Sequence, residues 1–122
     1  IGTSPDGGST YFLPRTIGLK KAMEVALLGD RFDAQQAFDL GLVNCVVPDK
    51  FLAKETKLIS ERLAKGPAYA LAETKKLLNG SLNANLAEQL TAETKAFVNC
   101  AIRKDFYEGV SAFTEKRPPN FE

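Results

Sequence analysis

Apolar side chains recur along most of this chain at intervals of three and four residues, which is the spacing of one face of an α-helix. The clearest stripe is formed by Leu19, Ala22, Met23, Ala26 and Leu27. Read in the same way, the whole sequence predicts helices at about 8–16, 19–28, 33–40, 50–64, 68–79, 83–102 and 104–117. We therefore expect a mainly α-helical fold.

Residues with strong capping or helix-breaking preferences mark several of the predicted boundaries. Asp33, followed three residues later by Gln36, is typical of a capping box, and Gly41 ends the short helix that begins there. The apolar, β-branched segment 42–47 is closed by Pro48. That segment predicts one short β-strand in an otherwise helical chain.

Composition and charge exclude several classes of protein. Of 122 residues 44% are hydrophobic and 25% are charged, which is typical of a globular domain, and the net charge of +1 provides no basic field for nucleic acid. The absence of histidine excludes a Ser-His-Asp triad, a Cys-His pair and any histidine-ligated metal site. No apolar run approaches the ~18 residues of a membrane helix. We expect neither a nucleic-acid partner nor a membrane partner.

The two cysteines and the start of the chain indicate its setting. Cys45 and Cys100 lack the CxxC spacing of a zinc or redox site, so we expect two buried thiols in a reducing compartment. The chain begins at Ile1 and enters a tight turn at once, so we expect it to be a piece of a longer protein. Striped helices with short connections cannot all shield one another, which favours an apolar surface that is buried by other subunits.

Without histidine, acid–base chemistry falls to carboxylates, lysine or tyrosine, and Asp6 has the most unusual setting among the carboxylates. It stands between Pro5 and Gly7-Gly8, where small neighbours let another molecule approach the backbone. Two interpretations are open. Asp6 is either a plain helix N-cap, or a carboxylate that transfers a proton or attacks as a nucleophile. Near the C-terminus, Lys116 and Arg117 either complement the helix dipole or bind phosphate.

Four stretches of the sequence match one known family in the correct order and spacing. The chain resembles the C-terminal half of the enoyl-CoA hydratase/isomerase (crotonase) family through SPDGGSTYFLPRTIG (4–18), KAMEVALLGDRFDAQQAFDLGLVNCVVP (21–48), KGPAYALAETKKLL (65–78) and DFYEGVSAFTEKRPPNF (105–121). The resemblance is to isomerase-like members, which carry Asp in the S-P-D-G-G turn.

The resemblance implies both a fold and a substrate class. Segment 1–48 would end the spiral α/β domain that binds acyl-CoA, and segment 49–122 would form the helical C-terminal region through which members assemble as trimers or hexamers. Members stabilise an enolate-like thioester oxyanion with two backbone N–H groups, and the glycine-rich part of that site and the hydratase glutamates lie earlier in the chain. Coenzyme A enters as part of the thioester substrate, and no metal or further cofactor is expected.

Three positions carry functional roles over from the family. Asp6 occupies the place of the acidic residue of isomerase-like members, where hydratases have glycine and where related dehalogenases of aromatic CoA esters have a nucleophilic aspartate. Phe97 matches an aromatic residue that packs near the adenine of coenzyme A. Lys116 matches the lysine of the E-K-R ending that meets the phosphates of coenzyme A, often those of a coenzyme A bound in a neighbouring subunit's site.

These matches imply an enoyl-CoA isomerase in which Asp6 moves a proton between two carbons of a fatty acyl-CoA. Two alternatives remain open: a hydratase or another acyl-CoA lyase or hydrolase of the same family, and a catalytically incomplete module for trimerisation and CoA contact. The expected location is the cytoplasm of a bacterium, or the mitochondrial matrix of a eukaryote.

Overall fold

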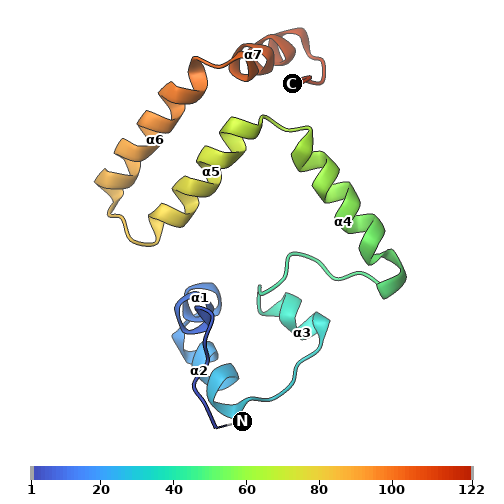
Figure 1. The fold of residues 1–122 in the computed structure, drawn as a ribbon, viewed down its shortest axis with the longest axis vertical. Coiled ribbons are helices and arrows are strands. Elements are labelled where there is room, and N and C mark those ends of the chain that lie inside the picture. The colour runs from blue at the N-terminus through green and yellow to red at the C-terminus, as the bar shows by residue number, and fades with distance from the viewer. Residues whose placement is uncertain (1, 122) are drawn as a thin grey trace. The chain divides into compact units, whose positions relative to one another are not determined.

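The computed structural model describes residues 2–121, most of which are helical (Figure 1). The described helices are α1 (Ser9–Ile17), α2 (Leu19–Leu28), α3 (Ala34–Asp39), α4 (Asp49–Ala64), α5 (Ala68–Ser81), α6 (Leu86–Ala101) and α7 (Lys104–Glu115). The chain divides into two compact units, 1–52 and 53–122, and the boundary falls inside α4. The expectation of a mainly helical fold is confirmed.

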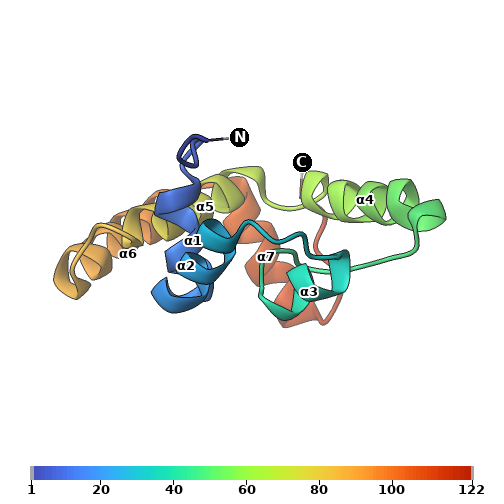
Figure 2. The ribbon, with the colours of Figure 1, turned by 90° about the horizontal axis from the view of Figure 1, so that it is seen from below.

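In the first unit, α1 packs against α2, and Gly18 forms the sharp connection between them (Figures 1 and 2). Gly18 has a φ of 78°, a value that a residue with a side chain rarely adopts. Ala22 on α2 is buried, as its place in the predicted stripe requires. The helix ends as predicted at Gly29, whose N–H donates to the carbonyl of Val25.

The predicted capping box at the start of α3 is present. The Asp33 carboxylate accepts from the backbone N–H of Gln36 at 2.8 Å, and the side chain of Gln36 accepts from the N–H of Asp33 at 2.9 Å. At the other end, Gly41 takes a φ of 76° and the N–H of Leu42 donates back to the carbonyl of Ala37. This pattern is a Schellman cap, in which the backbone N–H of Leu42 satisfies a carbonyl of the last helical turn.

The strand predicted at 42–47 is wrong, because residues 2–121 contain no β-strand. A strand requires a second strand to accept and donate its backbone hydrogen bonds. Within the described chain this segment has no such neighbour, and the side chains of Val43 and Val46 are exposed. The apolar, β-branched composition of segment 42–47 therefore does not mark a strand. It marks an irregular segment whose valine side chains are exposed.

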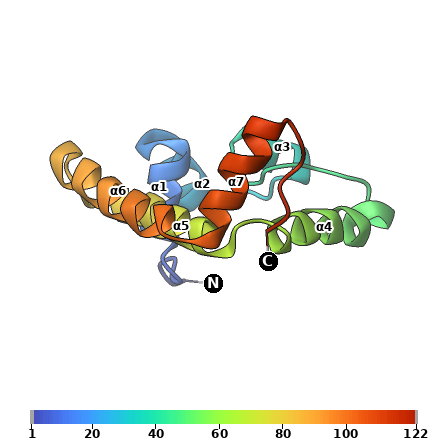
Figure 3. The same ribbon diagram turned by 90° about the horizontal axis from the view of Figure 1, so that it is seen from above.

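In the second unit, α5 and α6 run side by side in opposite directions, and α6 packs against α7 (Figures 1 and 3). The amide of Gln89 on α6 donates to the carbonyl of Leu77 on α5 at 3.3 Å. A second capping box, absent from the sequence prediction, starts α6: Asn85 and Glu88 each accept a hydrogen bond from the backbone N–H of the other.

The interior of the described chain is very small. Its buried residues are all alanines, namely Ala22, Ala37, Ala96 and Ala112. Large apolar side chains lie in solvent instead, with Leu27 80% and Phe113 87% exposed. The accessible surface is 10227 Å², whereas two separate compact domains of these lengths would expose roughly 7,800 Å². Much of the apolar surface therefore lacks cover within this chain, as the striped helices predicted.

The cysteines differ from their predicted state. Cys45 is exposed and Cys100 is half-buried, so the expectation of two buried thiols is wrong for this chain. The reason is the same small interior, which leaves few positions where a thiol could be enclosed. Among the helices that the structure describes, none has both the length and the apolarity needed to cross a bilayer.

Candidate functional site

The turn that carries Asp6 precedes α1 and is built on two consecutive glycines (Figure 2). Gly7 and Gly8 have φ values of 61° and 84°, so the backbone passes through the left-handed region twice. The carbonyl of Asp6 accepts the backbone N–H of Ser9 at 3.0 Å and its hydroxyl at 2.7 Å. These bonds engage the backbone carbonyl of Asp6 and not its carboxylate.

Asp6 is not the N-cap of α1, so that interpretation of its carboxylate is wrong. The N-cap is Gly8, and no side chain caps this helix end. The helix begins at Ser9, close to its predicted start, and Gly8 with a left-handed φ of 84° takes the N-cap position in place of Asp6. Asp6 is exposed, and within residues 2–121 its carboxylate has no hydrogen bond or ion pair.

The two glycines are needed for different reasons. A Cβ atom on Gly8 would lie 3.2 Å from the ring of Phe12, so the ring would have to shift slightly, and the positive φ would be strained as well. A Cβ atom on Gly7 would meet nothing within 4 Å, so only the positive φ requires glycine there. Beside Asp6 the backbone at Gly7 is thus open to an approaching molecule.

An apolar cleft of about 400 Å³ lies in the same unit, between α1 and α2. Pro5, the residue before Asp6, lines one part of it, and Leu13, Met23 and Leu27 line the rest with smaller neighbours. A cleft of this size and lining accepts an apolar group or a covering side chain.

Phe97 lies on α6 in the second unit and is 64% exposed. Its ring meets that of Phe106 on α7 edge to face, with 6.0 Å between centroids. This contact holds one edge of Phe97, and the remaining exposed area is suited to stacking on a flat aromatic group.

Lys116 follows the last residue of α7 and has a φ of 56°. Its N–H donates to the carbonyls of Ala112 and Phe113, and the N–H of Arg117 donates to Ala112 at 3.0 Å. These bonds close the helix end in the way that glycine usually does. Within residues 2–121 the ammonium group of Lys116 forms no ion pair.

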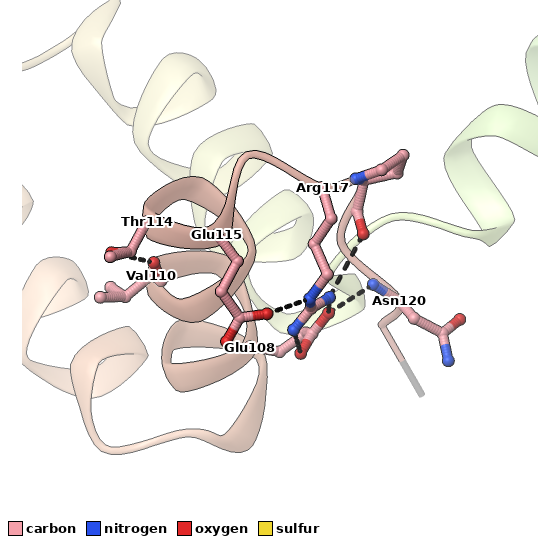
Figure 4. A network of polar contacts seen from close by, with 7 residues as sticks. Glu108, Val110, Thr114, Glu115, Arg117 and Asn120 are labelled. Atoms are coloured by element: carbon pink, nitrogen blue, oxygen red, sulfur yellow. Dashed lines mark hydrogen bonds and ion pairs between the residues drawn. The ribbon is translucent and has the colours of Figure 1, made fainter.

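Arg117 differs from Lys116 because carboxylates surround it (Figure 4). Its Nη1 and Nη2 atoms lie 2.6 and 3.0 Å from the two oxygens of Glu108, and its Nε lies 2.6 Å from Glu115. Glu108 also accepts the backbone N–H of Asn120 at 2.7 Å. The bonds from Arg117 and Asn120 lower the pKa of Glu108 to about 2, and the bond to Glu108 raises the pKa of Arg117.

Sequence reasoning missed this cluster. Glu108 and Arg117 are nine residues apart, on either side of the end of α7, and no helical spacing relates them. Both lie in the family-like E-G…E-K-R ending, which is the one signal that pointed to them. Of the two cationic residues after α7, Arg117 is paired with carboxylates, so Lys116 is the one that could bind an external anion.

A second apolar cleft, of about 370 Å³, lies among α5, α6 and α7. Tyr69, Phe106, Phe113 and Phe121 supply its aromatic lining, and the guanidinium of Arg103 lies 3.8 Å from the ring centroid of Tyr69. The second unit therefore presents a cleft, an exposed ring and a free lysine, whereas Asp6 belongs to the first unit. No cluster of three metal-ligating side chains occurs in the described residues.

Known proteins match the chain over its whole length. The sequence model of the family described as enoyl-CoA hydratase/isomerase matches residues 1–122. The mitochondrial enoyl-CoA hydratase of Pongo abelii is 38% identical over 122 residues, which are 100% of this chain and 42% of that protein. The 1,2-epoxyphenylacetyl-CoA isomerase of Escherichia coli K12 is 37% identical over 121 residues, 99% of this chain and 46% of that protein.

A solved structure agrees with these matches. The enoyl-CoA hydratase subunit I of Geobacillus kaustophilus HTA426 superposes with a TM-score of 0.95 at 37% identity, covering 99% of this chain and 47% of that one. The helices described above are thus a part of the crotonase fold. The chain belongs to the enoyl-CoA hydratase/isomerase family, and it spans about half the length of the relatives that it matches.

Proposed function

We propose that the whole protein is an enoyl-CoA isomerase that shifts a double bond in a fatty acyl-CoA, with Asp6 as the proton carrier. The observation that supports this most is the state of the Asp6 carboxylate. It is exposed, it caps no helix, and it has no partner in residues 2–121. A carboxylate held beside open glycine backbone, with no structural task, is suited to act on a ligand.

The proposed chemistry needs one carboxylate. The thioester carbonyl acidifies the protons on C2 of a 3-enoyl-CoA, and Asp6 removes one of them. The electron pair of the C–H bond passes into a dienolate whose charge rests on the thioester oxygen. Protonated Asp6 then returns the proton to C4, so the double bond moves from C3–C4 to C2–C3 with no net gain or loss of protons or electrons.

Coenzyme A would be held in part by the second unit. Phe97 offers an exposed aromatic face for the adenine, and Lys116 offers an ammonium group without a carboxylate partner for a phosphate. In this proposal coenzyme A is part of the substrate, and no metal or additional cofactor takes part.

A hydratase is the second candidate, and the level of identity favours it as much as the first. The hydratase and the isomerase named above are 38% and 37% identical to this chain. A hydratase needs two carboxylates to hold and split water. The family resemblance implies that both lie earlier in the protein, and that hydratases have glycine where this chain has Asp6, so Asp6 itself favours the isomerase. An acyl-CoA lyase or hydrolase with Asp6 as a nucleophile, and a module that contacts CoA without turnover, are the remaining alternatives.

We further propose that segment 1–48 completes the acyl-CoA-binding domain and that segment 49–122 mediates assembly into trimers or hexamers. The exposed apolar side chains of the helices support assembly, because residues 2–121 leave more apolar surface in water than a folded protein usually does, and other subunits would cover the part that the rest of the protein does not. Light scattering after gel filtration would test this, and a strictly monomeric protein at micromolar concentration would refute it. Because its relatives include bacterial and mitochondrial proteins, we propose that the protein works in a bacterial cytoplasm or a mitochondrial matrix.

The deciding experiment offers the protein, at its full native length, a 3-enoyl-CoA and a 2-enoyl-CoA in separate reactions. The isomerase proposal expects conversion of the first to the second, with no 3-hydroxyacyl-CoA formed from either, and loss of conversion in Asp6→Asn. Rapid hydration of the 2-enoyl-CoA would establish the hydratase instead. Release of free coenzyme A would establish a hydrolase.

A further inference from the structure

Lys116 occupies a backbone conformation that its side chain disfavours. Its φ of 56° is the sole positive value of a non-glycine residue in the described chain. Glycine is the usual residue at such a helix end, because a Cβ atom there crowds the following carbonyl oxygen. Strained residues persist where their surroundings hold them, and they concentrate at functional sites.

Glu108, on α7, forms hydrogen bonds with the segment that follows the turn at Lys116 (Figure 4). Its carboxylate binds the guanidinium of Arg117, directly after Lys116, and the backbone N–H of Asn120. Both groups lie on the segment that leaves the turn, so a single side chain on α7 fixes the chain at two points beyond Lys116. The side chain of Glu108 is 25% exposed and that of Arg117 39%, so solvent screens the pair in part, and the two-pronged geometry rather than burial fixes it.

Most of the donor capacity of Arg117 is used in this arrangement. Its three guanidinium nitrogens donate to Glu108, Glu115 and the carbonyl of Pro118. It can therefore hold the turn but has little capacity for an external anion. Lys116 remains free for one, and its direction depends on the turn that Glu108 closes.

We propose that Glu108 is a positioning residue for ligand binding. Through Arg117 and Asn120 it maintains the turn that presents the ammonium group of Lys116 to a phosphate of coenzyme A. Glu108 itself touches no ligand in this arrangement. The inference rests on the proposed function, because it takes the ligand to be a CoA thioester.

The test compares one acyl group on two carriers, using the protein at its full native length. An enoyl-CoA carries the nucleotide phosphates, whereas the matching enoyl-pantetheine lacks them. We expect Lys116→Gln to raise KM for the enoyl-CoA about 10-fold, the usual loss for one charge-assisted hydrogen bond. Glu108→Gln should raise the same KM several-fold, while kcat and the KM for enoyl-pantetheine stay unchanged.

A double variant separates positioning from general damage. If Glu108 acts through Lys116, Glu108→Gln combined with Lys116→Gln should be no worse than Lys116→Gln alone. Glu61→Gln is the matched control, because it removes an exposed glutamate with a loose 3.7 Å ion pair in the same unit, and it should change neither KM. Should Glu108→Gln fail to fold, Arg117→Lys keeps the charge but loses the two-pronged bond, and should shift the same KM.

Three outcomes would overturn the inference. They are an unchanged preference for CoA in Glu108→Gln, an equal loss with both carriers, and additive effects in the double variant. A protein that converts no enoyl-CoA at all would refute the proposed function instead, which keeps the two failures distinct.

Discussion

Arg117 and Glu108 face each other with two parallel hydrogen bonds, Nη1 to Oε1 at 2.6 Å and Nη2 to Oε2 at 3.0 Å. This two-pronged geometry is the strongest form of a charge-assisted pair and fixes direction as well as distance. It joins the middle of α7 to the segment after the helix, so residues 117–120 fold back on the last helix.

The pair predicts a specific response to acid. The pKa of Glu108 is lowered from its ordinary value of 4.5 to about 2 by Arg117 and the N–H of Asn120, with Glu115, Lys104 and Asp105 as the neighbouring charges. Since the pKa is lower in the folded state, the contribution to stability is complete above about pH 4.5 and is lost as the pH falls toward 2. The melting temperature of wild type minus that of Glu108→Gln should therefore shrink over this range. A constant difference would contradict the pairing.

Asp6→Asn separates a catalytic carboxylate from a structural one. If Asp6 carries the proton, kcat for the double-bond shift should fall roughly 10²–10⁴-fold, the usual value of a positioned acid–base group. KM should change little, because the amide keeps the size of the side chain. Steady-state kinetics at full native length would measure both.

Asp30→Asn is the control for this variant. Asp30 is exposed in the same unit, and no role is proposed for it. It should leave kcat unchanged. Equal rates for Asp6→Asn and wild type would remove Asp6 from the mechanism.

Lys116→Gly should stabilise the protein while weakening its binding of coenzyme A. Glycine relieves the left-handed backbone, and the net gain in unfolding free energy should be up to about 1 kcal/mol after its greater freedom in the unfolded chain is deducted. The converse variant is Gly29→Ala, at a φ of 67° with nothing near the new Cβ, which should cost about 1 kcal/mol. Urea denaturation would measure both, and a destabilised Lys116→Gly would show that the turn is not strained.

Asn85→Ala should lower stability by about 1 kcal/mol, because it removes the side chain that caps α6. Asp6→Ala should leave helix content and stability near those of wild type, because α1 is capped by Gly8 without a side-chain bond. Circular dichroism during thermal unfolding would compare the two. A similar loss in both variants would return Asp6 to a capping role.

Local signals predicted most helix positions but not the turns that need distant partners. The capping residues Asp33 and Gln36 located α3, since both partners lie within one turn. The last helix was expected to continue to residue 117, but it ends at Glu115, because Lys116 turns left-handed and Glu108 holds the segment beyond it. No pattern within a few residues of Lys116 carries that information.

The candidate site could be predicted from sequence patterns less well than the fold could. Gly7 and Gly8 indicated a special turn, yet residue preferences left both a helix cap and a functional carboxylate open for Asp6, and only the structure excludes the cap. The roles of Phe97 and Lys116 came from the family resemblance and stay predictions. Physical reasoning from composition could not supply them, because an exposed phenylalanine and an exposed lysine have no distinctive local pattern.

The interior made of four alanines has a calorimetric consequence. The heat-capacity change of unfolding reflects apolar surface that becomes hydrated, and methyl groups contribute little of it. Residues 1–122 in isolation should therefore unfold over a broad temperature range with a heat-capacity increment well below the ~12–15 cal/mol/K per residue of ordinary domains. A sharp transition with a full increment would mean that Leu27, Phe113 and their neighbours are already buried between copies of the chain before heating. Unfolding would then dissociate these copies as well as melt the helices.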